Sequence, residues 1–323
     1  MEEEKPRKVL IIKTGYSEFL DHRFDLKSSL GDVLRTTPIL HAFKGDYITW
    51  ATDERALPLL EENLFINRLM ALNWITEKQL RKEHFDVLVN LEKHPGIGVL
   101  ASEIDALQKY GFGTKMESKG LVSAAYDKGS EALSISLTPQ LKKDNAKPIQ
   151  EILFGVVGKK WNGEEYVLGY APKTEETDLI ALNTNVGGKW PTKAWPDNYW
   201  DDLENLLLKE NFKVTRQDNQ DASVLRDLNK YMDWINSSRV IISNDSLGMH
   251  LGIAMRKKVV GLFGPTPISE VYFYGRGVGL QPDNKYGCIP CMSPKCPPYG
   301  DTCLKLIHPE IVKDAAISLL RSN

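Results

Sequence analysis

Continuous apolar runs bounded by charged residues set the framework of the first half of the chain. Val9 to Ile12 is such a run, and this pattern is typical of a parallel strand that is buried on both faces. A polar stretch from Tyr16 to Lys27 follows, and residues 28–40 then show a helix start with apolar spacing of about 3.6 residues. Later segments repeat the alternation, with strands expected at 47–51, 86–91 and 110–113 and helices over 54–63 and 97–109. This alternation predicts a mostly parallel, doubly wound sheet.

The pattern is interrupted and then restarts, which predicts two domains. Polar stretches at 137–148 and 170–176 place the boundary near residue 172, giving domains 1–172 and 173–323. In the second half we expect strands at 178–183, 212–215, 240–243 and 259–263, with helices over 197–209 and 222–235. The simplest architecture is two Rossmann-like α/β domains facing each other across a cleft. A single large α/β sheet is the alternative.

The composition is that of an ordinary globular protein and disfavours some partners. Of 323 residues, 42% are apolar and 26% charged, and 41 basic against 43 acidic side chains give a formal charge of -2. Without a strongly basic balance, neither nucleic acid nor an anionic membrane is favoured. No run approaches the roughly 18 apolar residues of a membrane span, and the acidic start is unlike a signal peptide. We expect a cytoplasmic protein without a transmembrane segment, and the sequence is compatible with a peripheral membrane contact.

Ligands of open α/β sheets sit beyond the carboxyl ends of strands, which directs attention to the loop over residues 183–196. Paired glycines let backbone N–H groups approach an anion, a hydroxyl can donate, and lysines can neutralise phosphate. The residues of these types are Thr184, Gly187, Gly188, Lys189 and Lys193. The loop therefore fits a diphosphate cradle, and the alternative is an ordinary glycine turn anchored by Trp195-Pro196.

A second loop follows the strand expected at 240–243. Asp245 or Ser246 can cap the helix that starts there, and the free N–H groups of a helix start favour a bound phosphate. Asp245 suits sugar hydroxyls better than phosphate because two anions repel. His250 lies four residues beyond Ser246 and can share its face of the helix. Alternatively, Asp245 is only an N-cap and His250 a core histidine.

In the first half, Asp32 lies at a helix start, where its carboxylate could accept the proton of an attacking hydroxyl. Helix capping is the alternative. The glycines at 275–279 lack the dinucleotide fingerprint, so we assign no cofactor to them. No Asp-x-Asp pair suited to a divalent cation occurs, so the charge of a leaving group must be met by lysine and helix termini.

All the cysteines lie in one short segment, as Cys288, Cys291, Cys296 and Cys303. Disulfides are disfavoured in the cytoplasm, and thiolates at such spacing bind zinc or iron tetrahedrally. A complete set of four thiolates leaves no open position, so we expect a structural metal. Reduced, metal-free thiols are the alternative.

Several motifs in this order resemble glycosyltransferase family 9, the ADP-heptose heptosyltransferases that build the inner core of lipopolysaccharide or modify proteins. The segments that carry the resemblance span almost the whole chain: Val9 to Thr14, Ser29 to Leu34, Lys193 to Pro196, Asn244 to His250, Phe263 to Thr266, and Cys288 to Cys303 followed by Ile307 to Val312. The resemblance implies a GT-B fold, with the acceptor bound by the N-terminal half and the nucleotide sugar by the C-terminal half. It also implies inversion at the anomeric carbon without a catalytic divalent ion.

The resemblance assigns roles to individual residues. Asp32 matches the general base, and Lys193 matches the lysine on the donor phosphates. With the loops above, the expected donor site comprises Asn183, Thr184, Gly187, Gly188, Lys193, Asp245, Ser246, Gly248 and His250. The implied donor is ADP-heptose, and the acceptor is a glycan, a lipid-linked sugar or a protein.

Two departures from the family pattern bear on the substrates. The stretch from Tyr16 to Lys27 is inserted before the acid and is expected to form a lid or an acceptor-specific wall. Leu247 stands where a glycine commonly follows the hydroxyl residue. Other functions considered on the same scaffold are a sugar-nucleotide epimerase or hydrolase and a non-enzymatic sugar-nucleotide-binding protein.

Overall fold

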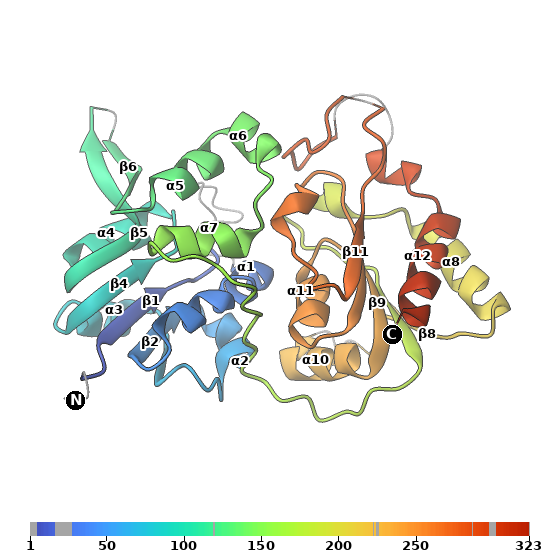
Figure 1. Ribbon diagram of the computed structural model, residues 1–323, viewed down its shortest axis with the longest axis horizontal. Helices are drawn as coiled ribbons and strands as arrows, with labels where there is room; N and C mark the ends of the chain where they lie inside the picture. The colour runs from blue at the N-terminus through green and yellow to red at the C-terminus, as the bar shows by residue number, and fades with distance from the viewer. Residues whose placement is uncertain are drawn as a thin grey trace. The chain divides into compact units, whose positions relative to one another are not determined.

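Figure 1 shows the computed structural model of the chain, which describes residues 5–16, 28–118, 120–221, 223, 226–285, 287–296 and 302–322. The chain divides into two compact units, Met1–Tyr170 and Ala171–Asn323, each with its own sheet. The predicted α/β class is confirmed, and the alternative of a single large sheet is wrong. Within the described ranges, none of the helices combines the length and apolar character that a bilayer crossing requires.

Unit 1 is built on a six-stranded sheet in the order β3-β2-β1-β4-β5-β6. The neighbouring strands are parallel except for the antiparallel pair β5 and β6. Its strands are β1 Lys8–Ile12, β2 Tyr47–Thr52, β3 Arg68–Ala71, β4 His84–Asn90, β5 Asp105–Glu117 and β6 Gly120–Ala125. Val9 to Ile12 of β1 are fully buried, as expected for a central strand covered on both faces.

The helices of unit 1 are short. They are α1 Leu30–Leu34, α2 Leu57–Leu60, α3 Trp74–Leu80, α4 Pro95–Glu103, α5 Ser130–Leu137, α6 Pro139–Asp144 and α7 Ile149–Val156, with 3₁₀ turns at Thr37–Phe43 and Glu54–Ala56. Except for Tyr16, the predicted lid over 16–27 lies outside the described residues.

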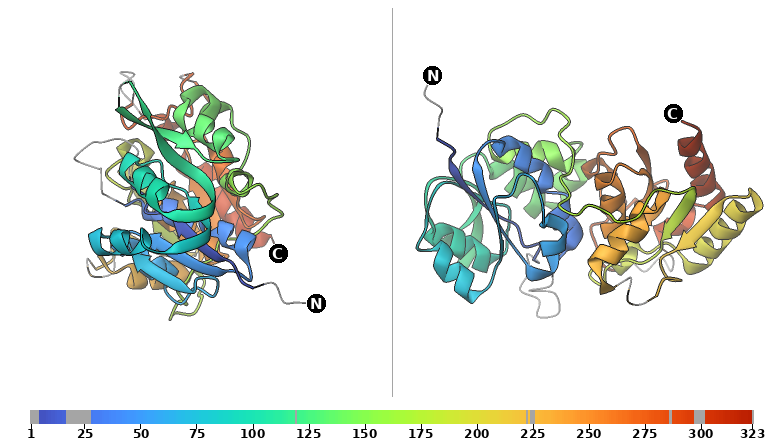
Figure 2. Two further views of the ribbon diagram at one scale, coloured as in Figure 1. Left: turned by 90° about the vertical axis from the view of Figure 1, so that its left-hand side faces the viewer. Right: turned by 90° about the horizontal axis from the view of Figure 1, so that it is seen from below.

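Two predicted helices of unit 1 need correction. The helix expected over 97–109 ends at Glu103, because β5 begins at Asp105 and is far longer than the strand expected at 110–113. The first half of β5 pairs with β4 and the second half pairs with β6. Beyond the end of β4, β5 and β6 therefore continue together as the twisted two-stranded ribbon seen in Figure 2. The helix expected over 28–40 stops after α1, and a 3₁₀ turn follows in which Pro38 has no N–H to continue an α-helix.

Unit 2 has a five-stranded, fully parallel sheet in the order β11-β10-β9-β7-β8. Its strands are β7 Leu179–Asn183, β8 Lys213–Arg216, β9 Ser238–Asn244, β10 Lys258–Leu262 and β11 Gly277–Leu280. Its helices are α8 Asp197–Lys209, α10 Leu228–Asn236, α11 Leu247–Ala254 and α12 Pro309–Arg321, with 3₁₀ turns at Pro191–Lys193, Ile268–Glu270 and Cys303–Leu306. The helix expected over 222–235 is interrupted at Asp227, the N-cap residue of α10: residues 223 and 226 are helical, α10 begins at Leu228, and residues 222, 224 and 225 lie outside the described residues.

Helices cover both faces of the unit 2 sheet. On one face α8 and α12 pack together, and their residues Trp200, Leu203 and Val312 join Ile242 of β9 in one buried cluster (Figures 1 and 2). On the other face, α10 packs against α11, and α11 lies so close to the sheet that a methyl group on Gly252 would touch Ile241. Burial of both faces explains the continuous apolar runs in β9 and β10.

Candidate functional site

The path of the chain through the unit 2 sheet creates a switch point between β7 and β9. From β7 the chain passes to β8 on one side, and β9, β10 and β11 then follow on the other. Asn183 at the end of β7 pairs with Ser243 near the end of β9. The crevice at such a switch point is where open α/β sheets bind ligands. The loops singled out in the sequence, 183–196 and 243–254, therefore start side by side.

Asn183 ties the two strand ends together with its side chain, which is fully buried. Its Nδ2 donates to Oγ of Ser243 at 2.8 Å and to Oγ of Ser246 at 2.9 Å. Its Oδ1 accepts from the phenol of Tyr231 on α10. Gln217, just beyond β8, contacts the same phenol oxygen with its Nε2 at 3.4 Å. The hydrogen bonds of Asn183 are thus made within the protein, and we call the buried layer of side chains below the switch point, to which Asn183 belongs, the floor of the site.

Asn244 fixes both ends of the loop that carries Lys193. Its Nδ2 donates to the carbonyl of Thr184 at 2.7 Å, and its Oδ1 accepts from the backbone N–H of Trp195 at 3.1 Å. The Trp195 ring is 1% exposed, its centroid lies 4.8 Å from that of Trp200, and its Nε1 donates to the carbonyl of Ile307. The Trp-Pro anchor proposed as the alternative reading of this loop therefore exists, and it holds Lys193 at the switch point.

Asp245 is the charged centre of the site. Its Oδ2 lies 2.7 Å from Nζ of Lys193 and accepts from Oγ1 of Thr266 at 2.6 Å, while Nε2 of His250 lies 4.0 Å from its Oδ1. Burial by itself would raise the pKa of Asp245, but the charges of Lys193 and His250 and the hydrogen bonds from Lys193 and Thr266 lower it to about 2. Asp245 is therefore a carboxylate at neutral pH.

The first turn of α11 has no side-chain cap. Ser246 is its N-cap residue, yet the serine side chain makes no capping hydrogen bond to the helix, since its oxygen accepts from Asn183 instead. N–H groups of the first helical turn have no intrahelical partner and favour an anion. Gly248, in this turn, has a packing role, because a Cβ there would lie 2.5 Å from both Cγ of Asn183 and the phenol oxygen of Tyr231.

The loop before Lys193 is arranged more loosely. A Cβ added at Gly187 or Gly188 would meet nothing within 4 Å, so no close approach requires glycine there. Oγ1 of Thr184 is buried and finds no hydrogen-bond partner in the described part of the chain. Lys189 is half-buried. Thr184 is therefore the donor in this loop that most needs a partner.

Asp32 of unit 1 lies in the first turn of α1, where the N-cap residue is Ser29. The residue at the N-cap position is thus Ser29, and Asp32 is the acidic residue of the first turn. Its side chain is 45% exposed, and its Oδ1 lies 3.3 Å from Nε of Arg35. Because the carboxylate is exposed, the hydroxyl group of a molecule that arrives from solution can contact it.

The loop that leads to Asp32 rests on a buried carboxylate that the sequence did not reveal. Glu92, which is 2% exposed, accepts from the backbone N–H groups of Thr14 and Gly15 and lies 2.9 Å from Nζ of Lys13. The carbonyl of Gly15 then accepts from the N–H of Ser29 at 2.8 Å. This sequence of contacts fixes the start of α1.

The four cysteines do not form a ligand set as they stand. All four are described, and among the described residues no group of three or more His, Cys, Asp or Glu side chains is arranged to hold a metal ion. Burial, with a contribution from the other three thiols, raises the pKa of Cys303 to about 11. The predicted metal site is therefore not evident in the side-chain arrangement.

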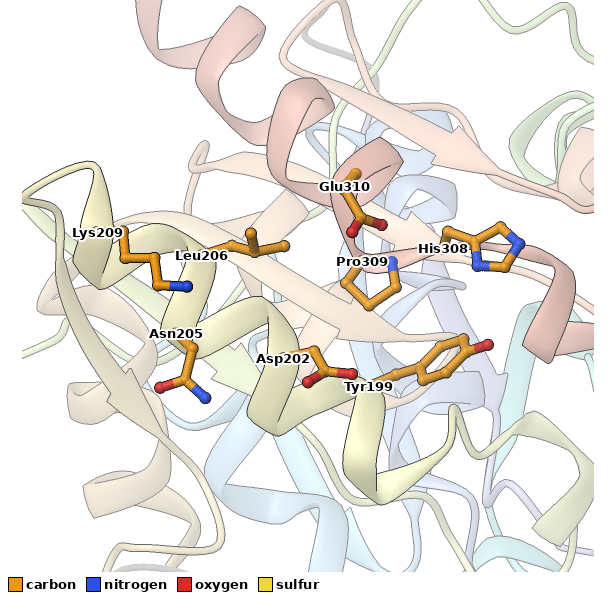
Figure 3. A pocket seen from close by; sticks show the side chains of 8 residues that line it. All are labelled: Tyr199, Asp202, Asn205, Leu206, Lys209, His308, Pro309 and Glu310. Carbon is orange, nitrogen blue, oxygen red and sulfur yellow. The ribbon is translucent and has the colours of Figure 1, made fainter.

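A separate pocket of unit 2 lies between α8 and α12 (Figure 3). It is lined from α8 by Tyr199, Asp202, Asn205, Leu206 and Lys209, and from the start of α12 by His308, Pro309 and Glu310. None of the residues predicted for the site lines it.

Three residues around the switch point were missed by sequence reasoning as contributors to the site: Gln217, Tyr231 and Thr266. Tyr231 belongs to a segment that showed only helix periodicity, and Gln217 lies between the expected strand at 212–215 and the expected helix over 222–235, where no motif drew attention to it. Thr266 belongs to the motif Phe263 to Thr266, which carried the family resemblance without a role, and this was the one available signal.

Known proteins resemble this chain in sequence. Residues 216–298 match the model of glycosyltransferase family 9 (heptosyltransferase). Lipooligosaccharide heptosyltransferase 2 of Campylobacter jejuni subsp. jejuni serotype O:2 is 27% identical over 122 residues, which is 38% of this chain and 37% of that protein. The aligned part is well under half of this curated relative.

Two solved structures share the fold over nearly their whole length. The family 9 glycosyl transferase of Veillonella parvula DSM 2008 has a TM-score of 0.63 at 19% identity, covering 98% of each chain. E. coli ADP-heptose lps heptosyltransferase II has a TM-score of 0.64 at 14% identity, covering 97% of this chain and 98% of that one. Identities this low show the fold alone.

Fold and site together define an α/β protein of the GT-B class, with polar loops gathered at a switch point of the second sheet. The resemblance to glycosyltransferase family 9 that the motifs indicated is supported by the matched segment 216–298 and by the shared fold.

Proposed function

We propose that this protein is an inverting glycosyltransferase that transfers heptose from ADP-heptose to a hydroxyl group of a lipopolysaccharide-core, other glycan or protein acceptor. The observation that carries the proposal is the ion pair of Lys193 and Asp245 beside the uncapped start of α11. The donor is supported by a fold relative, E. coli heptosyltransferase WaaC, which has been solved with ADP and with ADP-2-deoxy-2-fluoro heptose.

In this proposal the donor diphosphate lies at the switch point of unit 2. Lys193 neutralises part of its charge, the hydroxyls of Thr184 and Ser246 donate to its oxygens, and the first N–H groups of α11 complete the anion site. Asp245 and His250 face the sugar, because a carboxylate repels phosphate. Asn183, Gly187, Gly188 and Gly248 shape the backbone and floor. No catalytic metal is required, since these groups stabilise the leaving diphosphate.

Asp32 is the proposed general base. As the acceptor oxygen forms its bond to the anomeric carbon, the carboxylate takes the hydroxyl proton, and the bond between that carbon and the phosphate oxygen breaks. ADP leaves with the bonding electron pair, and attack from the opposite face inverts the anomeric carbon. Residues 1–172 then serve the acceptor and residues 173–323 the donor. We expect the reaction to take place in the cytoplasm, with a peripheral contact where the acceptor is lipid-linked.

We also propose a structural zinc or iron ion on Cys288, Cys291, Cys296 and Cys303. The arrangement of the side chains does not by itself fit a metal ion, so the ligand set would have to assemble around the ion. Supporting the proposal, the four thiols influence one another electrostatically, and TibC of enterotoxigenic E. coli, a fold relative, is described as an iron-containing glycosyltransferase. A bound cation would reverse the raised pKa of Cys296 and Cys303, because it favours the thiolate.

The test of the donor is calorimetric titration of the purified protein with ADP, UDP, GDP and CDP, followed by ADP-heptose. Selective binding of ADP is expected, and Lys193→Ala should weaken it by roughly tenfold or more, the loss of one charge-assisted contact. Lys209→Ala, which removes an ammonium group from α8 outside the site, is the matched control. Preference for another nucleotide would overturn the donor, and unchanged affinity in Lys193→Ala would overturn the site.

A further inference from the structure

A chain of buried hydrogen bonds lies beneath the start of α11. It runs from Gln217 through Tyr231 and Asn183 to Ser246. Gln217 and Tyr231 are 8% and 7% exposed, and Asn183 is fully buried. Buried polar groups are nearly always paired, so the donor and acceptor capacity of each neighbour decides the direction of each bond.

The backbone fixes the direction at the Gln217 end. The N–H of Asn185 lies 2.8 Å from Oε1 of Gln217, and because an N–H can only donate, this atom must be the amide oxygen. The other amide atom, Nε2, therefore donates to the phenol oxygen of Tyr231 at 3.4 Å. Burial raises the pKa of Tyr231, so the phenol keeps its hydrogen and donates it to Oδ1 of Asn183.

A second backbone group fixes the same direction independently. Oγ of Ser243 lies 2.6 Å from the carbonyl oxygen of Asn244, which can only accept, so Ser243 donates there. Ser243 must then accept from Asn183, which makes the atom facing it, at 2.8 Å, the amide nitrogen. The second hydrogen of that nitrogen goes to Oγ of Ser246 at 2.9 Å. Both ends of the network therefore give one orientation of the Asn183 amide.

This orientation decides what the Ser246 hydroxyl can do. Its oxygen already accepts from Asn183, so its own hydrogen remains to be donated. The side chain makes no capping bond to α11, and within the described parts of the chain its one side-chain hydrogen bond is the one that it accepts from Asn183. Ser246 is only half-buried, so the hydrogen can reach a ligand.

We infer that Tyr231 and Asn183 are positioning residues that turn the hydroxyl hydrogen of Ser246 outward, toward an oxygen of a bound nucleoside diphosphate. The inference rests on the proposed donor site and adds to it two residues that do not touch the ligand. Because each hydrogen bond of such a chain polarises the next, the relay also makes Ser246 a stronger donor.

A double-mutant cycle on ADP affinity tests the relay. Ser246→Ala removes the terminal donor and should weaken ADP binding by roughly 10- to 100-fold, as for a lost hydrogen bond to a charged group. Tyr231→Phe should weaken it by roughly 3- to 10-fold when Ser246 is present. In the Ser246→Ala background, the same change should add almost nothing, because the hydroxyl that Tyr231 orients is gone.

The controls separate positioning from general damage. Tyr126→Phe removes another buried phenol hydroxyl, in unit 1, and should leave ADP affinity unchanged; thermal melting of every variant reports on folding. Equal weakening by Tyr231→Phe in both backgrounds, or none in either, would overturn the relay while leaving the donor site standing. Failure of the unmodified protein to bind ADP would overturn the proposed donor, and the relay with it.

Discussion

The ammonium nitrogen of Lys193 lies 2.7 Å from the carboxylate of Asp245, with the two side chains only 18% and 10% exposed. The pair joins two loops that leave neighbouring strands, β7 and β9. Lys193 is therefore held in place before any ligand arrives, which lowers the entropy lost when the lysine meets a phosphate. The ion pair also places a negative charge near the proposed diphosphate. In the proposed arrangement Asp245 faces the sugar, so its carboxylate does not contact the phosphate oxygens.

The pair predicts a pH dependence of stability. The pKa of Asp245 in the folded chain, about 2, lies below its usual 3.8. The carboxylate therefore stabilises the fold above about pH 4, and this contribution, about 2 kcal/mol, is lost as the pH falls from about 4 to about 2. Asp245→Asn should accordingly lower the free energy of unfolding at pH 7, with a difference from the unmodified protein that shrinks below pH 4. Urea unfolding across this range measures it, with Asp144→Asn on exposed α6 as control; a difference independent of pH would contradict the assignment.

Asp32→Asn should lower turnover by roughly 10²- to 10⁴-fold while leaving the affinity for ADP-heptose nearly intact, because a base acts on the acceptor and not on donor binding. Its exposed side chain means that melting should change little. Steady-state transfer assays with a series of acceptors measure the effect, and Asp144→Asn again serves as control. Near-normal turnover would remove Asp32 from the mechanism, and sugar release at full rate without any acceptor would indicate a hydrolase.

Gly248→Ala should destabilise unit 2 by about 1–3 kcal/mol, because the added methyl would overlap Asn183 and the Tyr231 phenol. Gly155→Ala on α7 is the matched control: a Cβ there meets nothing within 4 Å, and alanine favours a helix over glycine. Chemical denaturation of the two variants should give changes of opposite sign. If Gly248→Ala has the same free energy of unfolding as the unmodified protein, the side chains below α11 can shift to accommodate the methyl group, and the predicted overlap is wrong.

Elemental analysis of gently purified protein should find about one zinc or iron ion per chain, as expected for a four-thiolate site. Cys291→Ser should lower this content and the melting temperature, because folding and binding are linked. Removal of the metal with a chelator should have the same effect on melting. A content near zero in fresh, unchelated protein would refute the site.

Much of the fold could be predicted because central strands leave a strong local signal. Val9 to Ile12 and Val240 to Ile242 are apolar throughout, and both lie in strands covered on both faces. Residues 105–109 carried no such signal, since this part of β5 mixes exposed polar and apolar side chains at the margin of the core. Its pairing with β4, distant in sequence, decides the strand, and a local reading of periodicity favours a helix there.

Some residues of the site could likewise be predicted from the sequence, and others could not. Lys193 and Asp245 could be singled out because helix starts and loops after strands have recognisable residue types. Tyr231 could not, because a tyrosine on the buried face of a helix looks like any core aromatic until the helix is placed beside β7. The roles of Gln217 and Asn183 likewise depend on which strands are neighbours, which is a property of the folded sheet.

The grip of Asn244 on both ends of the Lys193 loop has an engineering consequence. One buried amide sets where this loop leaves the sheet, at Thr184, and where it rejoins the fold, at Trp195. The ten residues from Asn185 to Ala194 thus lie between two fixed attachment points, so their sequence can be varied without changing where the loop leaves and rejoins the fold. A library confined to this segment, with Lys193 retained, is the natural starting point for redirecting the protein to a different nucleotide sugar.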